Sequence, residues 1–213
     1  MAYTWLVQPD VRVLKTSAPV ISSTSFMRMR AREAAAAGKP ARRVQRWVSY
    51  DSISPNLRRA ILAAEDGAFY DHEGIDWFEV RESIRGTMQK GEGLRGASTL
   101  TQQLAKNLYL SPSRNPYRKL SELFITRRLE AELSKRRILE IYLNVIEWGD
   151  GIWGCEAAAE AYFGVRAADL SLDQATLLAA AVSSPRVLNP ARPTARLLRA
   201  QQVILRRMNA TSR

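Results

Sequence analysis

The chain has 213 residues, of which 46% are hydrophobic and 25% charged. These ordinary globular values exclude general disorder and allow one domain with a substantial core. A single cysteine and a single histidine exclude a disulfide framework and a zinc cage of Cys and His ligands. The net charge of +11 favours an anionic partner: nucleic acid, anionic lipid or a phosphate-bearing substrate. Acidic residues gather between positions 65 and 82, which suits a carboxylate active site better than a nucleic-acid surface.

The N-terminal residues allow two interpretations. No stretch comes near the roughly 20 apolar residues that cross a bilayer. Residues 3–7 are nonetheless apolar and aromatic, and Tyr and Trp favour the membrane–water interface. They are either the start of an ordinary strand or the stub of a removed transmembrane anchor.

The rest of the chain is predicted to be helical. Residues 8–55 form an extended lead-in, broken by prolines, with a short helix over 28–37. The spacing of apolar residues predicts helices over 56–66 and 76–89, a three-glycine loop over 90–96, and a helix capped by Ser98. Further helices are expected over 116–133, 136–148, 154–163, 172–183 behind the capping box of Ser171 and Gln174, and 196–208. Because no segment alternates convincingly with a period of two, the predicted fold class is all-α.

Glu65 is the first candidate catalytic residue. It ends a helix whose preceding residues, 60–64, are apolar. A carboxylate at the edge of such a surface is partly desolvated, which suits a general acid or base. The alternative is a solvated acid at a helix end. Nearby, His72 is expected to be a structural hydrogen-bonding residue.

Residues 96–107 are a candidate anion cradle. A glycine followed by small hydroxyl residues at a helix N-terminus offers free backbone N–H groups and the positive end of the helix dipole. Lys106 lies about two turns after Ser98 and could add charge along the same helix. Plain helix capping is the alternative, and the missing Gly-Lys-Ser/Thr ending excludes a P-loop.

Two more segments combine charged and apolar residues. Arg118 and Lys119 precede Glu122 by about one helical turn, which is also what a salt-bridged helix face would show. Residues 135–144 carry an Ile/Leu stripe that indicates mainly core.

Taken in order, these segments resemble the peptidoglycan glycosyltransferases of family 51, lysozyme-like enzymes that polymerise lipid II. The resemblance covers about residues 47–210. Its four motifs read EDxxFxxHxG at 65–74, GxSTxTQQ at 96–103, RKxxE at 118–122 and KxxILExYLN at 135–144. Residues 149–159 are similar to the monofunctional biosynthetic type, and the chain has no Ser-x-x-Lys or Lys-Thr-Gly motif of a transpeptidase.

The resemblance implies roles for individual residues. Glu65 matches the catalytic base, which activates the 4-hydroxyl of an incoming lipid II, and Glu122 matches a second essential carboxylate. Lys106 and Arg114 match ligands of the donor pyrophosphate, which departs as the configuration inverts. The remaining substrate-binding residues implied are Ser98, Thr99, Gln102, Gln103, Asn107, Arg118 and Lys119. No obligatory cofactor is expected, and no ligand cluster indicates a divalent cation such as magnesium or manganese.

The resemblance also implies an organisation and a location. Residues 1–46 would be a lead-in with the stub of an anchor, and 47–213 the glycosyltransferase domain, with a mobile, membrane-facing jaw lobe over about 85–125. The domain would lie on the outer, periplasmic side of the bacterial cytoplasmic membrane, held by a single span. Its partners would be lipid II, the growing glycan strand, the anionic membrane surface and other cell-wall synthesis proteins, but not nucleic acid.

The sequence is also compatible with two alternative functions. A lytic transglycosylase would share the helical lobe and a catalytic glutamate, but it would cleave peptidoglycan. A basic helical protein that binds nucleic acid is the non-enzyme alternative, and its binding would be strongly salt-dependent.

Overall fold

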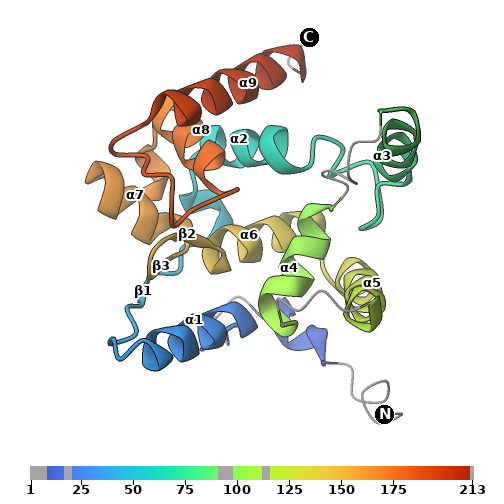
Figure 1. The fold of residues 1–213 in the computed structure, drawn as a ribbon, viewed down its shortest axis with the longest axis horizontal. Coiled ribbons are helices and arrows are strands. Elements are labelled where there is room, and N and C mark those ends of the chain that lie inside the picture. Colours follow the sequence, from blue (N-terminus) through green and yellow to red (C-terminus); the bar gives the residue numbers. More distant parts are fainter. Residues whose placement is uncertain (1–8, 17–20, 91–97, 112–115, 212–213) are drawn as a thin grey trace.

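The computed structural model describes residues 9–16, 21–90, 98–111 and 116–211 (Figure 1). The predicted anchor stub at residues 3–7, most of the three-glycine loop, and Arg114 lie outside these described residues. The described part is mostly helical, which confirms the all-α prediction. None of its helices is both long and apolar enough to cross a membrane.

The helices follow the predicted order, with ends shifted by a few residues. The α-helices are α1 (Ser25–Ala36), α2 (Pro55–Glu65), α3 (Trp77–Lys90), α4 (Leu100–Tyr109), α5 (Pro116–Glu132), α6 (Lys135–Val145), α7 (Cys155–Phe163), α8 (Leu172–Ala181) and α9 (Ala195–Thr211). Short 3-10 helices lie at η2 (Val11–Lys15), η3 (Tyr50–Ser52) and η4 (Ala167–Asp169). Helix α1 packs against α4, and the predicted domain boundary at residue 46 stays a prediction.

A small sheet was not expected. Strands β1 (Val44–Gln45), β2 (Glu147–Gly149) and β3 (Ile152–Trp153) form it in the order β1-β3-β2. Strand β1 runs parallel to β3, and β2 runs antiparallel to it. Strands this short cannot show an alternating pattern, and both β2 and β3 are buried throughout. The helix predicted over 136–148 therefore ends at Val145, and the chain turns into β2.

The predicted cap of α4 is corrected by one residue. Thr99, not Ser98, is the N-cap, because its hydroxyl accepts from the backbone N–H of Gln102 while the Gln102 side chain accepts from the N–H of Thr99. Only Thr99 has a glutamine three residues later, as a capping box requires. The capping box of Ser171 and Gln174 is confirmed at the start of α8.

The core is built around α6, which runs through the middle of the molecule (Figure 1). Helices α2, α8 and α9 pack together on one side of it, and α4 packs on another. The buried apolar residues of α6 are Ile138, Leu139, Ile141, Tyr142, Leu143 and Val145. This arrangement brings the end of α2 and the start of α4 to the same region.

Candidate active site

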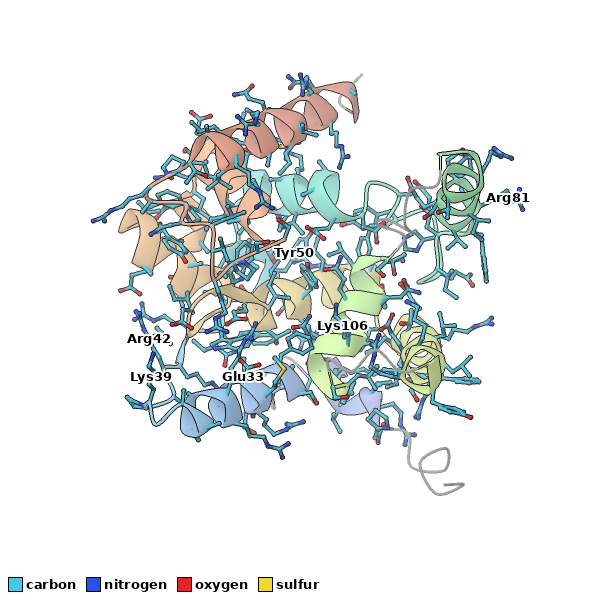
Figure 2. The ribbon with its side chains drawn as sticks, viewed as in Figure 1. Glu33, Lys39, Arg42, Tyr50, Arg81 and Lys106 are labelled. Atoms are coloured by element: carbon cyan, nitrogen blue, oxygen red, sulfur yellow. The ribbon has the colours of Figure 1, made fainter. Side chains whose placement is uncertain are left out.

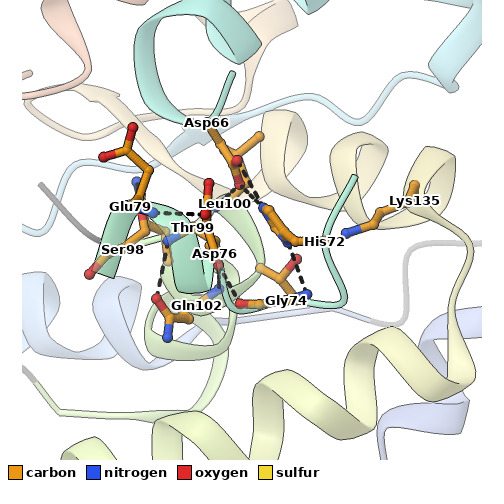
Figure 3. Close-up of polar contacts among 12 residues, drawn as sticks. Asp66, His72, Gly74, Asp76, Glu79, Ser98, Thr99, Leu100, Gln102 and Lys135 are labelled. Atoms are coloured by element: carbon orange, nitrogen blue, oxygen red, sulfur yellow. Dashed lines mark hydrogen bonds and ion pairs between the residues drawn. The ribbon is translucent and has the colours of Figure 1, made fainter. Parts of the chain in front are cut away.

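The loop after α2 is held by a buried carboxylate. One oxygen of Asp66, Oδ2, accepts from the backbone N–H of Leu100 at 2.8 Å, and the other, Oδ1, lies 3.0 Å from Nε2 of His72 (Figure 3). Because Nδ1 of His72 accepts a hydrogen bond from the N–H of Gly74, the ring carries its proton on Nε2. This N–H donates a hydrogen bond to Asp66. His72 is thus the structural hydrogen-bonding residue that was expected.

Gly74 fixes the far end of this loop against α4 and α5. Its carbonyl accepts from the Thr99 hydroxyl at 2.7 Å. Its backbone has a positive φ of 85°, and a Cβ at this position would lie 2.6 Å from Cγ2 of Thr126. Only glycine satisfies both conditions without strain. The loop therefore sets a defined distance between Glu65 and the start of α4.

We expect Gly74→Ala to lower the free energy of unfolding by about 1–3 kcal/mol, because it adds left-handed strain to a close contact. Gly86→Ala is the matched control, since Gly86 lies within α3 with nothing within 4 Å of an added Cβ. That control should be neutral or slightly stabilising. Urea denaturation of both variants measures the difference, and equal stabilities would contradict this account of the loop.

Glu65 is the last residue of α2 and is half-buried. Its Oε2 accepts from Nε2 of Gln103 at 2.9 Å, and Oε1 of Gln103 accepts from the hydroxyl of Tyr142 at 2.9 Å. Within the described part of the chain, Oε1 of Glu65 has no hydrogen-bond partner. One carboxylate oxygen is therefore held in place while the other remains available.

A cleft of about 730 Å³ opens beside Glu65. It is also lined by Ser98 and Thr99 at the start of α4, by residues of α3, and by Arg207 of α9. Nη1 of Arg207 donates to the carbonyls of Ala63 and Ala64 at 3.1 and 3.4 Å, in the last turn of α2. Arg207 lies far along the chain from the four motifs, and nothing in the sequence marked it.

A charged cluster lies farther along α4 and on α5. Glu122 is only 3% exposed, and its two oxygens lie 2.7 Å from Nη1 of Arg118 and 2.5 Å from Nζ of Lys119. These are the i,i+4 and i,i+3 pairs that the spacing allows, but the carboxylate is buried rather than on a solvated face. Breaking a pair of this kind leaves an uncompensated buried charge.

Lys106 lies on α4 and is half-buried (Figure 2). Burial lowers the pKa of its ammonium below the usual 10.5; the carboxylate of Glu122 opposes this shift, and the cations Arg118 and Lys119 add to it. Its Nζ lies 5.9 Å from the ring centroid of Phe26, on α1. Lys106 is therefore a partly desolvated cation, and such a cation attracts an anion more strongly than one in water.

The other predicted site residues have different surroundings. Thr99 and Gln102 are buried, and their polar atoms form the capping box. Nδ2 of Asn107 donates to the carbonyl of Gln103 at 2.9 Å. Arg114 lies outside the described residues. Across the described ranges, no group of three or more His, Cys, Asp or Glu side chains is placed to hold a metal ion.

Comparisons with known proteins identify relatives over most of the chain. A family model described as Transglycosylase matches residues 32–209. A biosynthetic peptidoglycan transglycosylase of Nitrosospira multiformis is 48% identical over 191 residues, which cover 90% of this chain and 83% of the relative. Proteins of the same description from Laribacter hongkongensis and Chromobacterium violaceum are 49% and 52% identical; the matches cover 88% and 76% of this chain, and 82% and 72% of those relatives.

Proposed function

This chain belongs to the transglycosylase family and polymerises the glycan strands of peptidoglycan, and from that premise we propose that Glu65 is the general base of the transfer. The substrates are lipid II and the growing glycan strand. One observation carries the proposal: Glu65 borders the cleft with one carboxylate oxygen held by Gln103 and the other without a partner in the described residues.

The reaction requires a base because a sugar hydroxyl is a weak nucleophile. The 4-hydroxyl of an incoming lipid II attacks C1 of the N-acetylmuramic acid at the end of the growing strand. Glu65 accepts the hydroxyl proton as the new β-1,4 bond forms, and undecaprenyl pyrophosphate leaves from the α position. A positioned general base typically contributes about 10²–10⁴-fold to such a step.

The leaving pyrophosphate requires positive charge. Lys106 supplies it from a partly desolvated position, where charge stabilisation is strongest. Glu122 orients the neighbouring cations through its contacts with Arg118 and Lys119. Ser98, exposed at the edge of the cleft, contributes its hydroxyl, and Arg114 joins these residues because it matches a donor-pyrophosphate ligand of the family.

A choice between two substrates tests the direction of the chemistry. Purified lipid II and finished peptidoglycan are supplied separately, and the products are followed by gel electrophoresis. We expect lipid II to be consumed into a ladder of glycan strands with release of undecaprenyl pyrophosphate, and finished peptidoglycan to remain intact. Cleavage of finished peptidoglycan without polymer formation would instead identify a lytic enzyme.

We further propose that the face formed by α3 and α5 contacts the anionic membrane surface. Trp77 and Phe78 are 68% and 71% exposed, and together with Arg127 of α5 they line a hollow of about 570 Å³. On α5, the exposed apolar side chains Tyr117, Leu120 and Phe124 fall on one stripe. Figure 2 shows Arg81 at the outer edge of α3, where a cation would meet lipid headgroups.

The double variant Trp77→Ser/Phe78→Ser should weaken binding to vesicles containing phosphatidylglycerol by at least about tenfold, because two large apolar side chains no longer enter the interface. Co-sedimentation of the protein with vesicles measures this. Val187→Ser/Leu198→Ser is the control, since it removes two exposed apolar side chains elsewhere. Equal losses in both double variants would remove the assignment of this face.

Two wider expectations remain part of the proposal. The resemblance supports a single membrane span that holds the catalytic domain on the outer side of the cytoplasmic membrane. It also supports contacts with other cell-wall synthesis proteins. The charge of +11 suits both an anionic membrane surface and an anionic substrate.

A further inference from the structure

A buried tyrosine lies behind the cleft and connects to Glu65 through one amide side chain. Tyr142 of α6 is fully buried, and its hydroxyl donates to Oε1 of Gln103 at 2.9 Å. Nε2 of Gln103, on α4, donates in turn to Oε2 of Glu65 at 2.9 Å. We propose that Tyr142 is a positioning residue that acts on Glu65 through Gln103. The inference rests on the proposed role of Glu65 as the base.

Three helices contribute one residue each to this chain of hydrogen bonds, so its geometry depends on their packing. Helices α4 and α6 pack directly against each other, and Asp66, next to Glu65, accepts from the first N–H of α4. Asn107 donates to the carbonyl of Gln103 from the following turn. The three polar groups therefore meet at positions that the backbone already determines.

The hydrogen bonds run in one direction, toward the carboxylate. Burial raises the pKa of the Tyr142 hydroxyl well above its usual 10, and the negative charges of Glu65 and Asp66 raise it further. The hydroxyl therefore keeps its proton and donates a hydrogen bond to Oε1 of Gln103. An amide that accepts at its oxygen is a stronger donor at its nitrogen. The chain thus directs the amide N–H of Gln103 at Oε2 of Glu65.

Without the tyrosine hydroxyl, the Gln103 amide loses the partner of its oxygen. A partly buried carbonyl left without a donor is unfavourable, so the amide would turn toward other donors. If its oxygen faced Glu65, two acceptors would be opposed. The carboxylate of Glu65 would then no longer be held in the position from which it accepts the proton of the incoming hydroxyl. Other charged groups also face Glu65 or line its cleft: Asp66, Asp76, Glu79, Lys106 and Arg207.

Tyr142→Phe tests the proposal because it removes only the hydroxyl. We expect the kcat for lipid II consumption to fall roughly tenfold, which is the worth of one hydrogen bond, with KM changed less than about twofold. We also expect the acid limb of the pH profile of kcat/KM to move to higher pH, because a carboxylate that loses a hydrogen-bond donor is protonated more readily. A merely structural role would not move this limb.

Tyr162→Phe is the matched control. Its hydroxyl also donates to a partly buried acceptor, the carbonyl of Trp148 at 3.1 Å, but it lies away from the cleft. It should keep wild-type kcat and the wild-type pH profile. A Tyr142→Phe enzyme with both wild-type values would overturn the inference.

Gln103→Ala provides a second measurement that does not depend on Tyr142→Phe alone. With the connecting amide removed, adding Tyr142→Phe should cause no further loss of kcat, whereas independent effects would multiply. Gln103→Glu, which is nearly isosteric, should move the acid limb further than Tyr142→Phe does, because it places a second carboxylate against Glu65. An unmoved limb in Gln103→Glu would also overturn the inference, even if Tyr142→Phe failed to fold.

The same assays separate this inference from the proposed function. If Glu65→Gln is inactive while the Tyr142 and Gln103 variants behave as wild type, Glu65 remains the base and only the positioning role fails. If Glu65→Gln stays active, the assignment of the base itself fails.

Discussion

Glu65→Gln should abolish glycan polymerisation and leave the protein folded. The substitution keeps the size of the side chain and replaces the carboxylate, which is the proposed acceptor of the proton of the attacking hydroxyl. The expected loss is roughly 10²–10⁴-fold in the initial rate of lipid II consumption. Because Glu65 is half-buried at the end of α2 rather than part of the core, the free energy of unfolding should change little.

Binding of a phosphoglycolipid inhibitor provides the control for this variant. The inhibitor should still bind, because glutamine is nearly isosteric with glutamate and leaves the proposed donor-site cations in place. Loss of both activity and inhibitor binding would indicate a damaged cleft instead of a missing base. Retention of more than about a tenth of the wild-type rate would remove Glu65 from the role.

Lys106→Ala should reduce polymerisation by about 10²-fold or more. A charge-assisted contact to phosphate in a desolvated site contributes a few kcal/mol to the transition state, and alanine removes it entirely. The variant should also bind the phosphoglycolipid inhibitor less tightly, whereas Glu65→Gln should not. Normal polymerisation by Lys106→Ala would show that the pyrophosphate lies elsewhere.

The lowered pKa of Lys106 predicts how this activity depends on pH. Burial disfavours the charged ammonium, so Lys106 loses its proton at a lower pH than an exposed lysine would. Activity should therefore fall on the alkaline side as this cation is neutralised. Lys106→Arg should lose activity through altered geometry but lack this alkaline limb, because guanidinium stays charged. An unchanged limb in Lys106→Arg would assign the titration to another group.

The sequence by itself determined most of the local structure. The existence and order of the helices and the capping box of Ser171 depend on residues within a few positions of one another, so the spacing of apolar and capping residues was sufficient for them. The same applies to Glu65, whose position directly after the apolar residues 60–64 is a local feature. The short strands were not predicted, because their pairing, such as Val44 with Ile152, joins distant segments and leaves no local pattern.

Only the tertiary structure decided which side chains meet. Tyr142 lies in the segment 135–144, whose Ile/Leu stripe indicated mainly core; because α6 packs against α4, its hydroxyl donates to Gln103. Arg207 of α9 donates to the carbonyl of Ala63 near the end of α2, 144 positions earlier in the chain. Glu122 had the spacing of a surface salt bridge, yet it is buried between its two cations. Periodicity reports which face of a helix is apolar, but the partner of each polar group depends on how the helices pack, and that is a property of the whole chain.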